Sequence, residues 1–478
     1  MCGRLVLKMN FLSSFCAAVV AVIALNGCQR FRPEPLSAAR GAAALEPRSL
    51  SDPRLKEFLE KNLDRDLNEW PLTRWDFGTL TLAAFYFHPS LDVARAQWNI
   101  AKAGVISAGG RPNPTIGLIP EYSFNPPGGV SPWLPSVTFD VPIETAGKRG
   151  HRVARARELS EAARLNIATT AWQARSRLRT SLLDWTIAAR RQELLRQQQS
   201  LQEKIVAQLE QRLRAGTISS FEFTSARIAL TKAQVEFADL SRLAAEARAR
   251  MAEAIGVPAT ALAEVTVDMD LKFPPESELI SSEIREKALH TRADILAALS
   301  EYAASESALH LEIAKQYPDV HLTPGYQWDQ GEHKWSFGVS LELPVLNQNQ
   351  GPIAEAKAKR AEAAARFEAV QAKALAEIDL GAASYHGAEA NLMKLEELLA
   401  AQSRQLSAVS AQFKAGAADQ LELLTAQTEL AAAELLRLEG NAKAMQALGQ
   451  LEDAIQRPFN ALSALETNPR LATQTQNP

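Results

Sequence analysis

The chain has 478 residues, a formal net charge of −3 and 46% hydrophobic residues, and only 6% of its residues are aromatic. Because no basic excess is left uncompensated, the charge balance gives no reason to expect a nucleic-acid partner. Few aromatic residues and abundant alanine favour long, closely packed helices over the core of a globular enzyme.

The N-terminus has the pattern of an export signal. Basic residues precede an apolar run over 11–25, which is too short for a membrane-spanning helix. The run ends in LNGC (25–28), which resembles the bacterial lipoprotein signal, although Asn26 stands where a small residue is usual. We therefore expect removal of residues 1–27 and lipidation of Cys28, with a plain secretory signal cut nearby as the alternative.

Cysteine usage supports lipidation. Cys2 and Cys16 lie within the segment to be removed, so the mature chain would keep only Cys28 and could form no internal disulfide. Gln29 follows that cysteine, whereas an aspartate there is the usual signal for retention in the inner membrane. The outer membrane is therefore the expected destination.

The rest of the chain is organised as two repeats. Each has a helix, a proline-marked strand, a loop, a second strand, a very long helix, a glycine and a shorter helix, in that order. Gly216 and Gly416 are 200 residues apart, and Pro114 and Pro318 are 204 apart, which indicates an internal duplication. The predicted segments are a lipidated tether with the start of an equatorial region (28–70), a first repeat (71–275), a second repeat (276–460) and a flexible C-terminal tail (461–478).

Each repeat is predicted to contribute two strands. Apolar and polar residues alternate with period two at about 114–124 and 136–143, and again at about 319–328 and 335–346. This alternation fits a half-buried soluble sheet as well as a membrane barrel, but a length of about ten residues suits a tilted membrane span.

Four such strands cannot close a barrel, because about eight are needed and open sheet edges are not tolerated in lipid. Several chains would therefore have to share one barrel, two chains giving eight strands and three giving twelve. Strand alternation would then place Asp140 and Glu342 on the face toward the lumen.

Two helical hairpins are predicted to follow the strands. No proline occurs from 147 to 214, which as one helix would be on the order of 100 Å long, and 351–414 repeats the design. The glycine after each long helix is interpreted as the turn into a shorter returning helix, for which Ser219 and Asp419 are suitable N-caps.

Enzyme signatures are weak. The sequence PIETAGKR (142–149) lacks the first glycine of a phosphate-binding loop and has Arg149 in place of serine or threonine. The seven histidines are scattered, and no His-Glu-x-x-His pattern occurs. We therefore expect no enzymatic activity, no cofactor and no tight metal site.

The order of these features over nearly all of the mature chain resembles the outer-membrane factor family, of which TolC is the best-known member. The strand-to-helix junctions at 140–156 and 343–358 resemble those of the branch that exports heavy-metal cations. The resemblance implies a mostly α-helical trimer, in which four strands per chain build a twelve-stranded transmembrane β-barrel above a long periplasmic coiled-coil tunnel.

The resemblance also implies a function. Members of this family are passive exit channels of tripartite efflux systems, docked to a periplasmic adaptor (a membrane fusion protein) and an inner-membrane pump, here of the RND type. The expected location is the outer membrane of a Gram-negative bacterium, lipid-anchored and with a large periplasmic part. Two alternatives remain open, which are the exit duct of a type I protein secretion system and a structural periplasmic coiled-coil lipoprotein.

Two groups of site residues follow from the resemblance. Glu422, with Glu222 as a second contributor, would form an acidic ring at the periplasmic aperture. The alternative is that both residues lie on a solvated helix face. The adaptor would dock on the hairpin tips, whose residues are small either for that reason or because tight turns favour small residues: Ala215, Gly216, Thr217, Ile218, Ala415, Gly416, Ala417 and Ala418.

Overall fold

The computed structural model describes residues 31–267, 269, 273 and 282–459. The predicted signal segment 1–27, Cys28 and the predicted tail 461–478 lie outside the described residues. The chain divides into a first unit of residues 1–48 and a second unit of residues 49–478. The described part of the first unit holds one helix, α2 (Ala38–Leu45), whose first turn is capped by the hydroxyl of Ser37.

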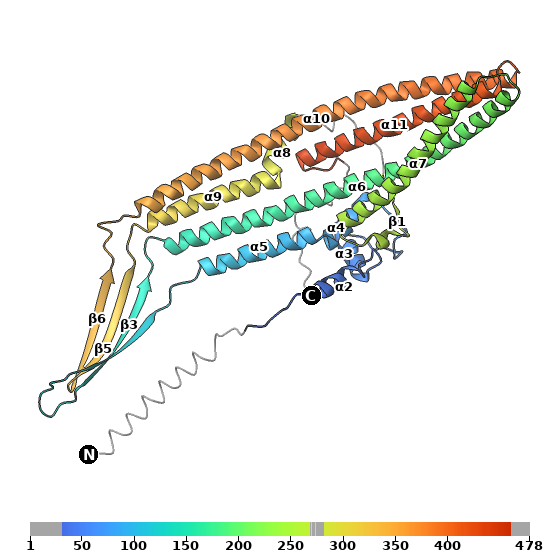
Figure 1. Ribbon diagram of the computed structural model, residues 1–478. Coiled ribbons are helices and arrows are strands. Elements are labelled where there is room, and N and C mark those ends of the chain that lie inside the picture. The colour runs from blue at the N-terminus through green and yellow to red at the C-terminus, as the bar shows by residue number, and fades with distance from the viewer. Residues whose placement is uncertain (1–30, 268, 270–272, 274–281, 460–478) are drawn as a thin grey trace. The chain divides into compact units, whose positions relative to one another are not determined.

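The second unit is mostly helical (Figure 1). It also contains a short parallel strand pair and a four-stranded sheet. The prediction of a mostly α-helical protein built from two repeats is confirmed. Its elements are α3 (Pro53–Leu63), β1 (Arg74–Trp75), α4 (Phe77–Phe87), α5 (Pro89–Ala108), β2 (Thr115–Tyr122), β3 (Trp133–Ile143), α6 (Lys148–Arg214), α7 (Ser220–Ile255), η1 (Ala259–Leu262), β4 (Thr266–Val267), α8 (Ser282–Thr291), α9 (Ala293–Ala314), β5 (Val320–Asp329), β6 (Glu332–Leu341), α10 (Gln350–Lys414) and α11 (Gln420–Ile455).

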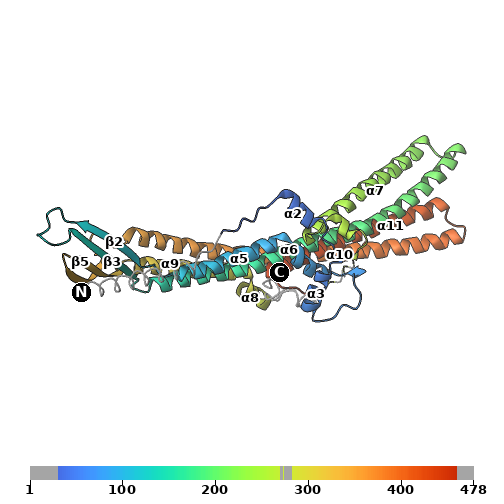
Figure 2. The same cartoon turned by 90° about the horizontal axis from the view of Figure 1, so that it is seen from below.

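The two long helices set the length of the helical part. Helix α6 has 67 residues and α10 has 65, so each is on the order of 100 Å long. Helix α6 packs on α7 and α10 packs on α11, which gives two hairpins directed away from the strands (Figure 2). On α7 the contacting side follows a heptad pattern, as expected of a coiled coil, with buried or half-buried Phe223, Ala226, Leu230, Ala233, Phe237 and Leu240.

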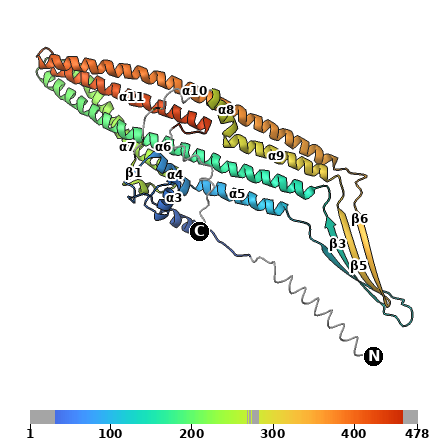
Figure 3. The ribbon, with the colours of Figure 1, turned by 180° about the vertical axis from the view of Figure 1, so that it is seen from behind.

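The helices form two open rows. Beside the strands, α9 lies between α6 and α10, and α5 covers the other side of α6 (Figure 3). Nearer the hairpin tips the row runs α10, α11, α6, α7. Among the described helices, none combines the length and the hydrophobicity that crossing a membrane would require.

The four-stranded sheet is antiparallel, in the order β2-β3-β5-β6. Strands β3 and β5 pair in the middle and join the two repeats. One face is apolar and exposed, and includes Leu118, Phe139, Trp335, Phe337 and Val339. The opposite face carries mostly glycine, serine, threonine and charged residues. The outer edges of β2 and β6 have no strand partner within the described residues.

The prediction for the fourth strand was wrong at both ends. Strand β6 spans Glu332–Leu341, whereas alternation predicted 335–346. Leu341 pairs with Val320, the first residue of β5, so nothing remains for the next residues to pair with. Pro344 also has no N–H to donate to a ladder. Glu342 therefore lies beyond the strand, and its predicted place in a barrel wall is corrected.

The main core lies where the two repeats meet at the base of the hairpins, with buried Leu80, Leu178, Leu182, Met251, Tyr385 and Leu451. A buried ion network crosses it. Arg175 and Arg179 of α6 donate to Glu452 of α11, over 3.0 and 2.6 Å. Burial alone would raise the pKa of Glu452, but Arg175 and Arg179 outweigh this effect and hold the pKa below its usual value. The network therefore stabilises the contact between the repeats.

Candidate functional site

Both hairpin tips have the same backbone geometry. Gly216 has a φ of +69° and Gly416 a φ of +74°. The N–H of Gly216 donates to Leu213 and that of Thr217 to Arg212, both over 2.9 Å, which is the Schellman pattern of helix ends. A Cβ added at either glycine would meet nothing within 4 Å. Glycine is therefore required for its left-handed conformation and not for space.

The predicted tip residues lie in these two turns. Residues 215–217 and 415–417 are exposed, and Ile218 and Ala418 are half-buried. The tips thus present a small, exposed surface, whose role as a docking site stays a prediction.

The returning helices begin differently at the two tips. The hydroxyl of Ser219 accepts from the N–H of Glu222 over 3.3 Å. Asp419 accepts from the N–H of Glu422 over 2.8 Å, and the Glu422 carboxylate accepts from the N–H of Asp419 over 2.9 Å. This reciprocal capping box gives Glu422 a local structural role that sequence reasoning missed, although the spacing Asp-x-x-Glu is its signature.

The two hairpins are linked just above their tips. Arg212 of α6 contacts the Asp419 carboxylate over 2.7 Å, and Gln208 donates to Gln420 of α11 over 2.9 Å. The hydrogen bond from Arg212, together with the N–H of Glu422, lowers the pKa of Asp419. Sequence reasoning missed Arg212 and Gln208, because no local pattern relates residues more than 200 positions apart.

At the other end of the helices, the polar face of the sheet carries Asp140. Its two carboxylate oxygens lie 2.9 and 3.1 Å from Nδ1 of His321 on β5. Both side chains are 39% exposed. The alternation of the strands put both residues on the polar face, but their contact depends on strand pairing that the sequence did not specify.

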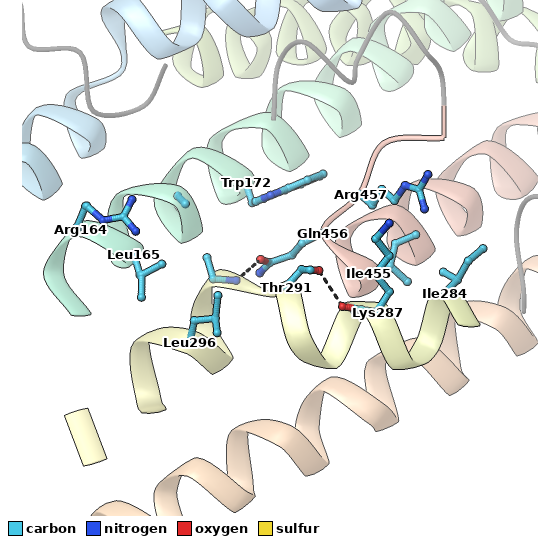
Figure 4. Close-up of a pocket in the computed structure, with 13 residues that line it drawn as sticks. Arg164, Leu165, Trp172, Ile284, Lys287, Thr291, Leu296, Ile455, Gln456 and Arg457 are labelled. Carbon is cyan, nitrogen blue, oxygen red and sulfur yellow. Dashed lines mark hydrogen bonds between the residues drawn. The ribbon is translucent and has the colours of Figure 1, made fainter. Parts of the chain in front are cut away.

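A pocket of about 350 Å³ lies between α6, α8, α9 and α11 (Figure 4). Trp172, Leu165 and Ile455 line it with apolar surface, and Gln456 accepts from the N–H of Ala293 over 2.9 Å at its side. The residues that line it include the basic side chains of Arg164, Lys287 and Arg457 but no aspartate or glutamate. Across the described residues there is also no group of three or more His, Cys, Asp or Glu side chains that could hold a metal ion.

Two such repeats, each with a long helical hairpin and two strands of a shared four-stranded sheet, are the architecture of outer-membrane efflux channels. The chain belongs to the outer membrane efflux protein family, whose model matches residues 86–257 and 284–456. The two matched segments correspond to the two repeats. The chain is therefore an outer-membrane efflux protein.

Individual relatives agree with this assignment. The chain is 25% identical over 349 residues to the cobalt-zinc-cadmium resistance protein CzcC of Cupriavidus metallidurans, covering 71% of this chain and 80% of that protein. Its fold is similar to the outer membrane protein VceC of Vibrio cholerae (TM-score 0.65, 19% identity, 80% of this chain and 97% of that one). It is also similar to the outer-membrane channel OprN (TM-score 0.66, 20% identity, 91% and 99%) and to CusC (TM-score 0.64, 16% identity, 91% and 100%).

Proposed function

We propose that this chain assembles as a cyclic homotrimer whose shared β-barrel and helical tunnel form a passive exit duct for heavy-metal cations. The observation that carries the proposal is that every layer of the second unit is an open row. The outer strands of the sheet are β2 and β6. The helical row beside the strands ends in α5 and α10, and the row nearer the hairpin tips ends in α7 and α10. One end always belongs to the first repeat and the other to the second. Such a row closes when identical copies join head to tail.

The two ends carry surfaces that suit each other. The free side of α7 has exposed apolar residues at a seven-residue spacing, Phe221, Ile228 and Val235, on the side opposite its seam with α6. Val93 and Ile100 repeat this spacing on α5. Helix α10 presents an exposed stripe of mostly small residues at steps of three and four, which lets a neighbouring helix approach closely: Ala354, Ala358, Ala361, Ala365, Ala369, Ala372, Ala376, Leu380, Ala383, Gly387 and Ala390.

Three copies fit a duct better than two. Two copies would give eight strands, and an eight-stranded barrel is filled by its own side chains. Three copies give twelve strands, with the polar face toward the lumen and the exposed apolar face, including Trp335 and Phe337, toward lipid. The same count gives twelve helices around the tunnel.

The relatives support the cargo and the partners. CzcC is a cobalt-zinc-cadmium resistance protein, which supports heavy-metal cations as the substrate. We place the periplasmic adaptor on the exposed tips around Gly216 and Gly416, with an RND-type pump in the inner membrane beyond it. Cys28 would carry lipid that tethers each chain to the outer membrane. Replacement Cys28→Ser should abolish lipid labelling, and labelled mature protein from this variant would exclude Cys28 as the anchor.

The duct is tested by electrical recording. Purified full-length protein added to a planar bilayer should give discrete, cation-selective conductance steps, and residues of the polar face should control them. Variant Thr138→Arg, on the polar face, should reduce the conductance. Variant Val339→Thr, on the apolar face, should leave the unitary conductance unchanged. Absence of steps from protein that inserts into the bilayer would contradict the duct.

A further inference from the structure

The polar face of the sheet is lined by small residues across its middle. Gly117, Thr138, Gly325 and Ser336 form one row across the four strands. A Cβ on Gly117 would lie 2.7 Å from the Thr138 hydroxyl oxygen, and one on Gly325 would lie 2.6 Å from that of Ser336. A side chain at either glycine would have to displace the neighbouring hydroxyl group, and the four residues of the row carry no charge.

His321 and Asp140 are the titratable strand residues of this face nearest the helices. His321 pairs across the strands with Pro142 on one side and Ser340 on the other. Asp140 approaches its ring from the neighbouring strand. The other titratable side chains of the face, those of Glu121, Asp329, Glu332 and Lys334, lie at the far end of the strands.

The hydrogen bond between the two residues fixes the chemistry of the ring. A carboxylate can only accept, so Nδ1 of His321 must carry the proton that it donates to Asp140. In the neutral ring the lone pair is then on Nε2, and no hydrogen-bond partner of Nε2 occurs among the described residues. A histidine held by a carboxylate in this way is the usual arrangement of a metal-binding imidazole, because the carboxylate orients the ring and makes it more basic.

We propose that Nε2 of His321, oriented by Asp140, is a transient ligand for borderline transition-metal cations such as Zn²⁺, Co²⁺ or Cd²⁺ that pass along the polar face. This inference rests on the proposed duct and adds a contact point for its cargo. One imidazole with water as the remaining ligands binds weakly. Weak binding suits conduction, since an ion must be held well enough to enter and loosely enough to leave. A cyclic trimer would carry three such groups at one level.

The test uses the full-length assembly and Zn²⁺ as the probe. Zn²⁺ should block the K⁺ current through wild-type channels at millimolar or lower concentration. Variant His321→Gln keeps a donor for Asp140 but has no imidazole, and should raise the half-blocking concentration about tenfold or more. Variant Asp140→Asn keeps His321 but loses the carboxylate charge that orients the ring. It should raise the half-blocking Zn²⁺ concentration about tenfold, the lower end of the range for loss of a carboxylate that holds a metal-binding histidine.

The matched control is His333→Gln. His333 lies on β6 on the apolar face, and its Nδ1 is 2.7 Å from the Tyr326 hydroxyl instead of a carboxylate. Zn²⁺ should block the K⁺ current through this variant at the same concentration as in the wild type. Unchanged block in His321→Gln, or an equal loss in His333→Gln, would overturn the proposal.

A second measurement separates this proposal from the duct itself. Equilibrium dialysis of ⁶⁵Zn²⁺ against the detergent-solubilised assembly should show one weak site per chain that His321→Gln removes and His333→Gln keeps. If the channels do not conduct, the proposed function is contradicted, and dialysis still shows whether His321 binds Zn²⁺. If channels conduct but dialysis shows no difference between the variants, the site fails and the duct stands.

Discussion

At the scale of single residues, the hairpin tips depend on backbone conformation. Gly216 and Gly416 are both left-handed, and both have open space around them. The repeated use of glycine was therefore predictable from the sequence, because an interruption between two strong helical patterns needs a left-handed residue. The role of Glu422 was only partly predictable, since the same carboxylate caps its helix and is exposed at the tip.

Replacement Gly216→Ala is expected to destabilise its tip by about 1–2 kcal/mol, because a side chain is strained in the left-handed region. Hydrogen exchange of residues 212–222 should become faster. Gly150→Ala is the control, since Gly150 lies inside α6 with nothing within 4 Å of a new Cβ. That change should stabilise the helix locally by up to about 1 kcal/mol and so slow hydrogen exchange around residue 150. Equal effects of the two variants would mean that conformation is not the reason for glycine at the tip.

Charge and capping at Glu422 can be separated by choice of substitution. Glutamine can still accept from the N–H of Asp419, so Glu422→Gln should keep α11 intact and remove only the charge. Glu422→Ala should also weaken the cap, by about 1 kcal/mol. If an acidic ring exists, both variants should reduce cation selectivity in reversal-potential measurements. Selectivity unchanged in Glu422→Gln would leave this residue as a helix cap alone.

At the scale of elements, the sequence predicted the hairpins and the strands because their periodic patterns are long. Prediction from the sequence failed where contacts with residues distant in the chain determine the structure. Strand β6 stops where β5 begins, although the alternating pattern continues past Leu341. The contacts of Arg212 with Asp419 and of Arg179 with Glu452 join residues 207 and 273 positions apart, so no local pattern could reveal them.

Loss of the buried carboxylate between the repeats should be costly. Glu452→Ala would remove the carboxylate that buried Arg175 and Arg179 share, while Arg179 keeps its ion pair with Asp453, and is expected to destabilise the fold by about 3 kcal/mol. Glu193→Ala breaks an exposed ion pair with Arg196 and an exposed hydrogen bond from Gln197, and should cost less than about 1 kcal/mol. Thermal unfolding in detergent would compare them, and similar unfolding temperatures would contradict the structural role of the network.

The same network predicts a pH dependence. The pKa of Glu452 is lower in the folded chain than in the unfolded one, so its stabilisation is present above the unfolded value of about 4.3 and is lost as pH falls through the folded pKa. Wild-type protein should therefore lose stability on acidification more steeply than Glu452→Gln. Parallel curves for the two proteins would show that Glu452 does not contribute to acid sensitivity.

At the scale of the whole molecule, the open rows are the basis for the proposed assembly of several copies. The second unit leaves the edges of β2 and β6 and the free sides of α5, α7 and α10 without a neighbour among the described residues. These surfaces are apolar or small, which is unusual for helices that face only water. The sequence predicted that several chains share one barrel, from the strand count. It did not predict the exposed stripe on α7, whose meaning depends on knowing which side of the helix faces α6.

A charge placed in that stripe should weaken assembly. Val235 is 64% exposed and lies on the free side of α7, so Val235→Glu would bury a carboxylate against the next copy. Gln234→Glu introduces the same group one residue away and outside the stripe. Cross-linking of detergent-solubilised protein should show fewer oligomers for Val235→Glu only. Equal yields would mean that the stripe is not an interface.

The mass of the purified full-length protein in mild detergent tests the account most directly, because the shared duct exists only if a fixed number of copies closes the open rows. The account predicts one species containing three chains, after correction for bound detergent. A species of one chain with full helix content, or of two chains, would contradict the shared barrel and the tunnel that continues from it.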